Sequence, residues 1–121
     1  MSAEETMQRW WNDVWQEGRD DLVAELVADP YVRHGASATV RRNHQELRDD
    51  LRQFQRVLHH PTVTIDDAAY ADDKVWGRVT MEGLNRETGE MRTVSWLQVH
   101  RLENDKIAES WMLYANGIDW R

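Results

Sequence analysis

The sequence has no cysteine, only two prolines and no long hydrophobic run. Without cysteine, a disulfide framework, a thiolate metal site and a cysteine nucleophile are all excluded. No stretch approaches the roughly 18 consecutive apolar residues of a membrane-spanning helix. The amino-terminal string MSAEETMQRWW is acidic and lacks an apolar core. We therefore expect no signal peptide and a cytoplasmic location.

The sequence has fewer basic than acidic residues: it contains 15 Lys and Arg and 22 Asp and Glu, which gives a formal net charge of −7. No cluster of basic residues stands out along the chain. An acidic protein is repelled by phosphate backbones and by anionic lipid, so we expect neither nucleic acid nor a membrane as a partner. A chain of this length can bury one core, and we expect a single domain spanning residues 1–121.

Apolar residues in the first part of the chain recur at helical spacing. Ser2, with Glu5 three residues later, is a capping-box signature. The stripe that follows, at i, i+3, i+4 and i+7 spacing, comprises Met7, Trp10, Trp11, Val14 and Trp15. This pattern predicts a helix whose tryptophans pack in the core, and Gly18 is expected to end it.

Two further helices are expected. A short one begins near Asp20 and ends before Pro30, because the residue before proline avoids the α region. A longer one begins near Asn43 and ends before Pro61. Residues 59–60, both histidines, are expected to complement the negative end of that helix. The string YVRHG between the two helices is expected to be extended.

The apolar period then changes from helical to alternating, which is typical of half-buried strands. Four segments show it: TVTID, KVWGRVTMEG, MRTVSWLQVHRL and KIAESWMLY. The polar strings NRETGE and ENDK between them have the length of hairpin turns. Helices grouped before an antiparallel sheet predict an α+β fold with the helices on one face of the sheet.

The last two strands suggest a pocket wall if ENDK closes a regular hairpin. His100 then lies opposite Glu109, and the side chains on the same face are Trp96, Gln98, Trp111, Leu113 and Ala115. Large aromatic residues combined with isolated polar groups are typical of ligand pockets. A core strand whose polar end emerges into water fits the same pattern.

The order of elements and four strings resemble the SnoaL-like branch of the nuclear transport factor 2-like superfamily. These strings are ADPYVRHG, ELRDDLRQF, VWGRVTMEG and HRLENDKIAESW, and the resemblance covers essentially the whole chain. It implies a cone-shaped α+β fold, in which three N-terminal helices pack on a curved antiparallel sheet and enclose one pocket. It also implies a small apolar or cyclic organic ligand and a homodimer formed through the outer face of the sheet.

The resemblance does not select one reaction, since the family includes polyketide cyclases, epoxide hydrolases, ketosteroid isomerases, dehydratases and non-catalytic binding proteins. Aldol cyclases of the family carry a carboxylate four residues after the tryptophan of E-x-W, where this sequence has Ala115. Members similar to limonene-epoxide hydrolase have an RVD string and an aspartate two residues after that tryptophan. Here the corresponding residues are Arg78-Val79-Thr80 and Leu113. The arginine is retained and the carboxylates of both mechanisms are missing.

Histidines remain as candidates for proton transfer, because imidazole titrates near neutrality. The resemblance places His34 where the first strand offers a polar group to the pocket, although a surface or structural histidine is the alternative. The His100–Glu109 pair is a second candidate, against a plain cross-strand polar pair. Arg78 either binds a ligand oxygen or anion, with Glu109 as its partner, or faces outward as a solvated charge.

The other candidate residues would bind the substrate or shape its cavity: Tyr31, Trp76, Thr80, Trp96, Gln98, Trp111, Leu113 and Ala115. We expect no metal and no organic cofactor, because no two histidines have ligand spacing completed by a carboxylate. The sequence predicts an enzyme that uses general acid/base catalysis for cyclisation, isomerisation, dehydration or epoxide opening. The alternative is a ligand-binding or dimeric interaction module that has lost the carboxylates of the family.

Overall fold

The computed structural model describes residues 1–121. Its helical segments are α1 (Ala3–Arg9), which continues as a π-helix over Trp10–Gln16, a 3-10 turn (Asp20–Leu22) leading into α2 (Val23–Leu26), and α3 (His44–Val57). Its strands are β1 (Val27–His34), β2 (Thr39–Arg42), β3 (Leu58–Ala71), β4 (Lys74–Asn85), β5 (Met91–Glu103) and β6 (Lys106–Asn116). None of the helices combines the length and the apolar character that a membrane span requires.

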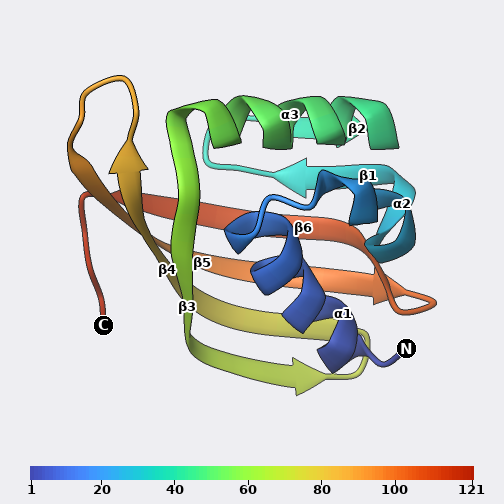
Figure 1. The fold of residues 1–121 in the computed structure, drawn as a ribbon. Coiled ribbons are helices and arrows are strands. Elements are labelled where there is room, and N and C mark those ends of the chain that lie inside the picture. The colour runs from blue at the N-terminus through green and yellow to red at the C-terminus, as the bar shows by residue number, and fades with distance from the viewer.

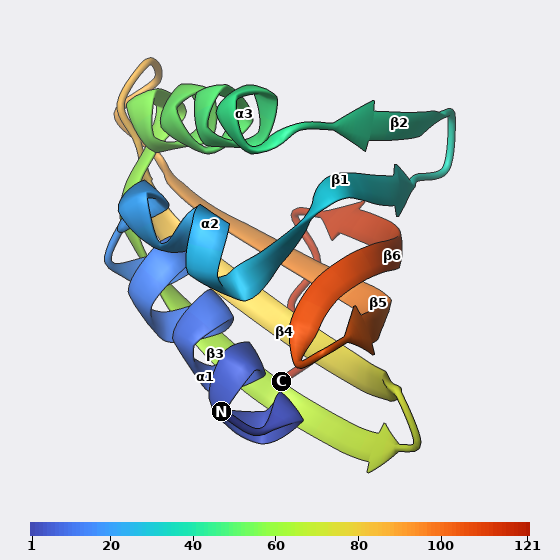
Figure 2. The same cartoon turned by 90° about the vertical axis from the view of Figure 1, so that its right-hand side faces the viewer.

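The six strands form one curved sheet in the order β2-β1-β6-β5-β4-β3. The helices α1, α2 and α3 lie on the same side of this sheet (Figures 1 and 2). We call this side the helix face and the opposite side the open face. The predicted α+β fold, with helices on one face, is confirmed. The sheet is mixed rather than antiparallel throughout, because β1 runs parallel to β6, to which no hairpin joins it.

Local sequence signals account for where the helices begin. Ser2 caps α1 by accepting a hydrogen bond from the Glu5 backbone N–H. Asn43 caps α3 with a complete capping box: its side chain accepts from the Glu46 N–H, and the Glu46 carboxylate accepts from the Asn43 N–H. These bonds satisfy backbone donors that have no partner within the helix. Both predicted helix starts are confirmed.

The end of α3 differs from the prediction. The helix ends at Val57, and β3 begins directly at Leu58. Residues 59–60 therefore lie in a strand, and their predicted role at a helix terminus is wrong. Leu58 continues the apolar spacing of the helix, so the sequence pattern could not show where the backbone becomes extended.

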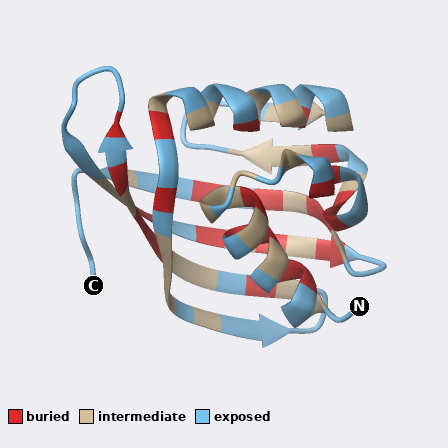
Figure 3. Ribbon diagram, viewed as in Figure 1, coloured by how far each residue is buried: buried red, intermediate tan, exposed pale blue.

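The core fills the layer between the helices and the helix face of the sheet (Figure 3). The first helical segment contributes Trp10 and Trp11, both nearly fully buried, which confirms their predicted core role. The sheet contributes Val75, Val79 and Met81 from β4. No charged residue is buried, and the buried polar residues are Thr6, Thr80, Asn85, Ser95, Gln98, His100 and Ser110.

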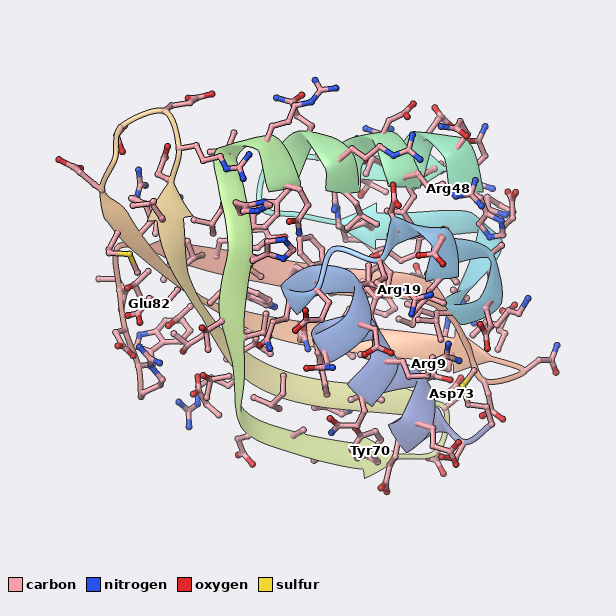
Figure 4. The ribbon with its side chains drawn as sticks, in the orientation of Figure 1. Arg9, Arg19, Arg48, Tyr70, Asp73 and Glu82 are labelled. Atoms are coloured by element: carbon pink, nitrogen blue, oxygen red, sulfur yellow. The ribbon has the colours of Figure 1, made fainter.

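Residues 117–121, which we call the tail, fold back onto the open face over β4 and β5. The Trp120 N–H donates to Ser95 Oγ at 3.3 Å. Arg78 Nη1 donates to the Trp120 carbonyl oxygen at 3.2 Å. The last residue of the chain forms an ion pair with Glu82, which Figure 4 shows on the strand beside the C-terminal end. The tail thus covers one part of the open face and leaves the remainder exposed.

Candidate functional site

A β-bulge in β6 decides which side chains of the last hairpin share a face. Next to the turn, Leu102 pairs with Ile107, as a regular hairpin requires. Ala108 then has no partner, and the register shifts by one residue. Because side chains alternate along a strand, one extra residue moves every later side chain of β6 to the opposite face.

Beyond the bulge, Arg101 rather than His100 lies opposite Glu109. His100 instead lies opposite Ser110. The predicted His100–Glu109 pair is therefore wrong. The physical reason is the bulge, which no residue type near ENDK signals in the sequence.

The bulge also divides the predicted pocket wall between the two faces of the sheet. The side chains on the helix face are Trp96, Gln98 and His100. Those on the open face are Trp111, Leu113 and Ala115. Trp111 and Leu113 are 38% and 55% exposed, whereas Trp96 is 4% exposed. The prediction that these side chains line one cavity is wrong.

A polar cluster lies on the helix face where β5 and β6 meet. His100 Nδ1 lies 2.5 Å from Ser110 Oγ. Trp96 Nε1 donates to Gln98 Oε1 at 2.8 Å. Tyr31 on β1 is 3% exposed; burial raises the pKa of its phenol, and the nearby Ser110 opposes that rise. The cluster combines three predicted site residues of the hairpin with Tyr31 and with Ser110, which the sequence did not single out.

Burial keeps the titratable groups of this cluster uncharged. Desolvation lowers the pKa of His100 to about 3, so its imidazole is neutral near pH 7. Desolvation also raises the pKa of Tyr31 to about 12, against the opposing effects of the nearby Ser110 and of the charge on Arg33. The site can therefore offer neutral hydrogen-bonding groups rather than a buried ion.

Unpaired polar atoms distinguish this cluster from an ordinary core. His100 Nε2 and Gln98 Nε2, two residues apart on β5, have no hydrogen-bond partner, and neither has Trp11 Nε1 in the same core layer. Buried polar atoms are nearly always paired, so each unpaired one requires an explanation. No residue of the cluster is more than 4% exposed, so the cluster is closed to solvent in this conformation.

Arg33 lies in the same row of the sheet as the cluster. It is the register partner of Ser110, which is in turn the partner of His100. Burial raises the pKa of Tyr114, and the nearby charge of Arg33 opposes that rise. Arg33 is half-buried, and none of the salt bridges of the structure involves it. The cluster therefore has a free positive charge at one side.

His34 lies on the open face, where it lines a solvent-facing groove, and not between the sheet and the helices. Its Nε2 is 2.7 Å from Glu109 Oε2, and its Nδ1 is 2.8 Å from Thr39 Oγ1. Its ring stacks on Trp111, with centroids 5.2 Å apart and planes 18° apart. The hydrogen bond from His34 is the main cause of the lowered pKa of Glu109, and Arg101 adds to it. A histidine–carboxylate pair exists, but with a different histidine and on the other face.

An exposed groove of about 620 Å³ runs beside this pair on the open face. Its lining includes the predicted site residues His34, Trp76, Arg78, Gln98, Trp111 and Leu113. Trp76 is 52% exposed and Leu97, also in the lining, is 49% exposed. The groove is thus a largely apolar, solvent-facing surface that crosses the sheet from the end of β1 to β3.

Arg78 and Thr80 also belong to the open face. The Thr80 hydroxyl donates to Asp66 Oδ2 at 2.5 Å and is fully buried. Arg78 Nη1 lies 3.8 Å from Asp66 Oδ2 and holds the tail through the Trp120 carbonyl. Of the two alternatives for Arg78, the structure shows the outward one, without contact to Glu109. Neither side chain points toward the polar cluster on the helix face.

The sequence matches the model of the SnoaL-like domain over residues 7–110. The chain belongs to the SnoaL-like family. No curated protein matches it at a significant level. Membership of this family indicates small-molecule function of the cyclase or isomerase type.

Solved structures confirm that the chain has the fold of this family. A candidate polyketide cyclase from Acidithiobacillus ferrooxidans has a TM-score of 0.85 at 16% identity, covering 94% of this chain and 91% of that one. IdmH, a candidate polyketide cyclase from Streptomyces antibioticus, has a TM-score of 0.79 at 19% identity, covering 94% and 92%. A Catenulispora acidiphila protein with a ketosteroid isomerase-like fold, solved with trimethylamine, has a TM-score of 0.79 at 16% identity, covering 94% and 88%.

In this SnoaL-like chain the predicted site residues separate into two groups. The helix-face group consists of Tyr31, Trp96, Gln98 and His100. The open-face group consists of His34, Trp76, Arg78, Thr80, Glu109, Trp111, Leu113 and Ala115. Sequence reasoning missed Arg33 and Ser110. For Arg33 a signal was available, because the neighbours His34 and Arg33 on one strand must face opposite sides of the sheet.

Proposed function

We propose that this chain binds a small carbonyl compound at the polar cluster of the helix face and promotes cyclisation or isomerisation by polarising the carbonyl oxygen. The observation that carries the proposal is His100 Nε2, a fully buried imidazole nitrogen without a partner. Gln98 Nε2, two residues away on the same face, is also unpaired. A polar atom of a ligand would give these nitrogens the partners that they lack.

The chemistry follows from the neutrality of the cluster. His100 stays uncharged because its pKa is about 3, so it acts on an oxygen as a hydrogen-bonding group and not as a cation. Donors held in fixed positions stabilise the negative charge that develops on oxygen during enolisation. No carboxylate belongs to the cluster, so the fitting substrates are those with acidic C–H bonds, such as 1,3-dicarbonyl compounds, whose proton passes to a solvent water as the enolate forms.

The ligand would enter past Tyr114 and Trp96. These rings are 5.8 Å apart on the helix face, and Tyr114 is 52% exposed while Trp96 is 4% exposed. Rotation of the exposed Tyr114 ring would uncover the buried Trp96 ring and, behind it, Gln98. Aromatic side chains of this kind give an apolar wall to a ring-shaped substrate.

Deuterium exchange at acidic C–H positions tests the proposal without knowledge of the natural substrate. A panel of cyclic 1,3-diketones in D₂O is followed by NMR with and without the protein. We expect the protein to accelerate exchange of at least one compound, and His100→Gln to lose about 10²–10³-fold of the acceleration. The matched control is His59→Gln, an exposed histidine on β3, which keeps the full rate. The absence of any acceleration by the unmodified protein contradicts the proposal.

The lack of a carboxylate favours a second candidate function, a non-catalytic binding protein. The same panel of 1,3-diketones distinguishes a binding protein from an enzyme. A binding protein shows saturable binding of a diketone by calorimetry with no gain in exchange rate, whereas the enzyme shows both.

We also propose that two copies associate through the open face. Four large apolar side chains there are between 38% and 55% exposed: Trp76, Leu97, Trp111 and Leu113. An exposed apolar patch with a polar rim is typical of protein interfaces. Glu109, Arg101 and Arg78 supply such a rim, with charges of both signs.

A further inference from the structure

Two of the three unpaired polar atoms of the helix face, those of Trp11 and Gln98, can only donate hydrogen bonds. Trp11 Nε1 is an indole nitrogen, and an indole N–H can only donate. The orientation of the Gln98 amide is fixed, because Trp96 Nε1 donates to its Oε1 at 2.8 Å. The unpaired atom of Gln98 is therefore its NH₂ group, which is also a donor.

The tautomer of His100 decides whether its free nitrogen is a donor as well. Its Nδ1 is 2.5 Å from Ser110 Oγ, and either atom can donate in this contact. When Ser110 donates and Nδ1 accepts, the proton of the neutral imidazole lies on Nε2. The ligand assignment below requires this Nε2–H form.

Arg33 supplies the fourth donor, and the only charged one. It lies in one row with Ser110 and His100 across β1, β6 and β5. Two strand spacings separate Arg33 from His100, which is roughly 10 Å between their backbones. A guanidinium has five N–H donors and no acceptor, and it favours carboxylate oxygens.

We propose that the ligand of the helix face is a keto acid, with its carboxylate at Arg33 and its ketone oxygen at His100 and Gln98. The position of the ketone oxygen rests on the proposed function, whereas the position of the carboxylate at Arg33 is inferred independently of it. A carboxylate near His100 would be buried without a counter-charge, which is costly, whereas Arg33 is half-buried and free. In this proposal Ser110 is a positioning residue, which donates to Nδ1 and so holds the Nε2–H form of His100.

Three compounds of one size test the two anchors by calorimetry. They are 3-benzoylpropionate, which has both groups, its methyl ester, which lacks the charge, and 4-phenylbutyrate, which lacks the ketone. We expect 3-benzoylpropionate to bind at least about tenfold more tightly than either of the others, since hydrogen bonds between charged partners are the strongest. Equal affinities for the acid and its ester overturn the proposal, and so does a failure of 3-benzoylpropionate to bind.

Variants of two arginines assign the carboxylate. Arg33→Gln should weaken 3-benzoylpropionate by about tenfold or more and leave the ester unchanged. The control is Arg41→Gln, an exposed arginine on the neighbouring strand with its side chain on the open face, which should change neither. Equal loss in both variants would mean that only net charge attracts the acid, and the assignment would then be wrong.

Imidazole ¹⁵N spectra of the free protein test the tautomer separately. We expect His100 in the Nε2–H form, mixed tautomers in Ser110→Ala, and no change in Ser95→Ala, the buried serine of the open face. The Nδ1–H form in the unmodified protein overturns the positioning role. Binding of the keto acid, together with no gain in deuterium exchange for any diketone of the panel, would defeat the proposed catalysis and leave this ligand assignment standing.

Discussion

His100 combines complete burial with a titratable ring, and this makes the stability of the protein sensitive to acid. Its pKa is about 3 in the folded chain, against an ordinary value of 6.5. Between these two values the unfolded chain binds a proton that the folded chain does not. The free energy of unfolding therefore falls as the pH drops below 6.5, by up to about 1.4 kcal/mol per pH unit, and is unaffected by His100 above that pH.

The corresponding prediction concerns His100→Gln, which cannot take up the proton. Its free energy of unfolding, measured by urea titration between pH 5 and 6.5, should fall more gently with acid than that of the unmodified protein. Equal slopes for the two proteins would mean that His100 is not buried in its neutral form.

At this scale the sequence singled out His100, Gln98 and Tyr31 as candidate site residues, but it could not predict their neighbours. The pairing of His34 with Glu109 depends on β1 lying parallel to β6, which joins residues 75 positions apart. No local pattern reports such a contact. The unpaired state of His100 Nε2 also depends on the whole core around it.

Among the elements, the bulged hairpin and the tail have the largest effect on function. The bulge at Ala108 sends Trp111 to the open face and keeps Ser110 inside. Strands, turns and caps could be predicted, since they follow from alternation, turn residues and capping boxes. A bulge adds one residue without altering that alternation noticeably, so the predicted register was right only next to the turn, where Leu102 pairs with Ile107 and Glu103 with Lys106.

The tail should detach when its anchor is removed. In Arg78→Ala the Trp120 carbonyl loses its donor, and we expect faster amide hydrogen exchange at Gly117 and Trp120, whose N–H groups bond to Thr93 and Ser95. Exchange in α3 should stay unchanged and serves as the internal control. Unaltered exchange at both tail amides would show that Arg78 does not hold the tail.

The whole molecule has two faces with different tasks in this account. The helix face holds the ligand, and the open face, where the tail leaves Leu97 and its neighbours exposed, joins two copies. Sedimentation should therefore give a dimer, and Leu97→Asp should give a folded monomer, because a carboxylate at the centre of the interface is left without a partner. The control Leu84→Asp, at an exposed leucine near the end of β4, should remain a dimer. A monomer at high concentration of the unmodified protein contradicts this assembly.

The central claim is that the ligand binds on the helix face and not in the open-face groove, and indole N–H resonances distinguish the two. Trp11 and Trp96 report on the helix face, and Trp76 and Trp111 on the groove. In a titration with 3-benzoylpropionate followed by ¹⁵N NMR, we predict that the signals of Trp11 and Trp96 shift with saturation while those of Trp76 and Trp111 stay in place. Saturable shifts of Trp76 and Trp111 alone would contradict the account.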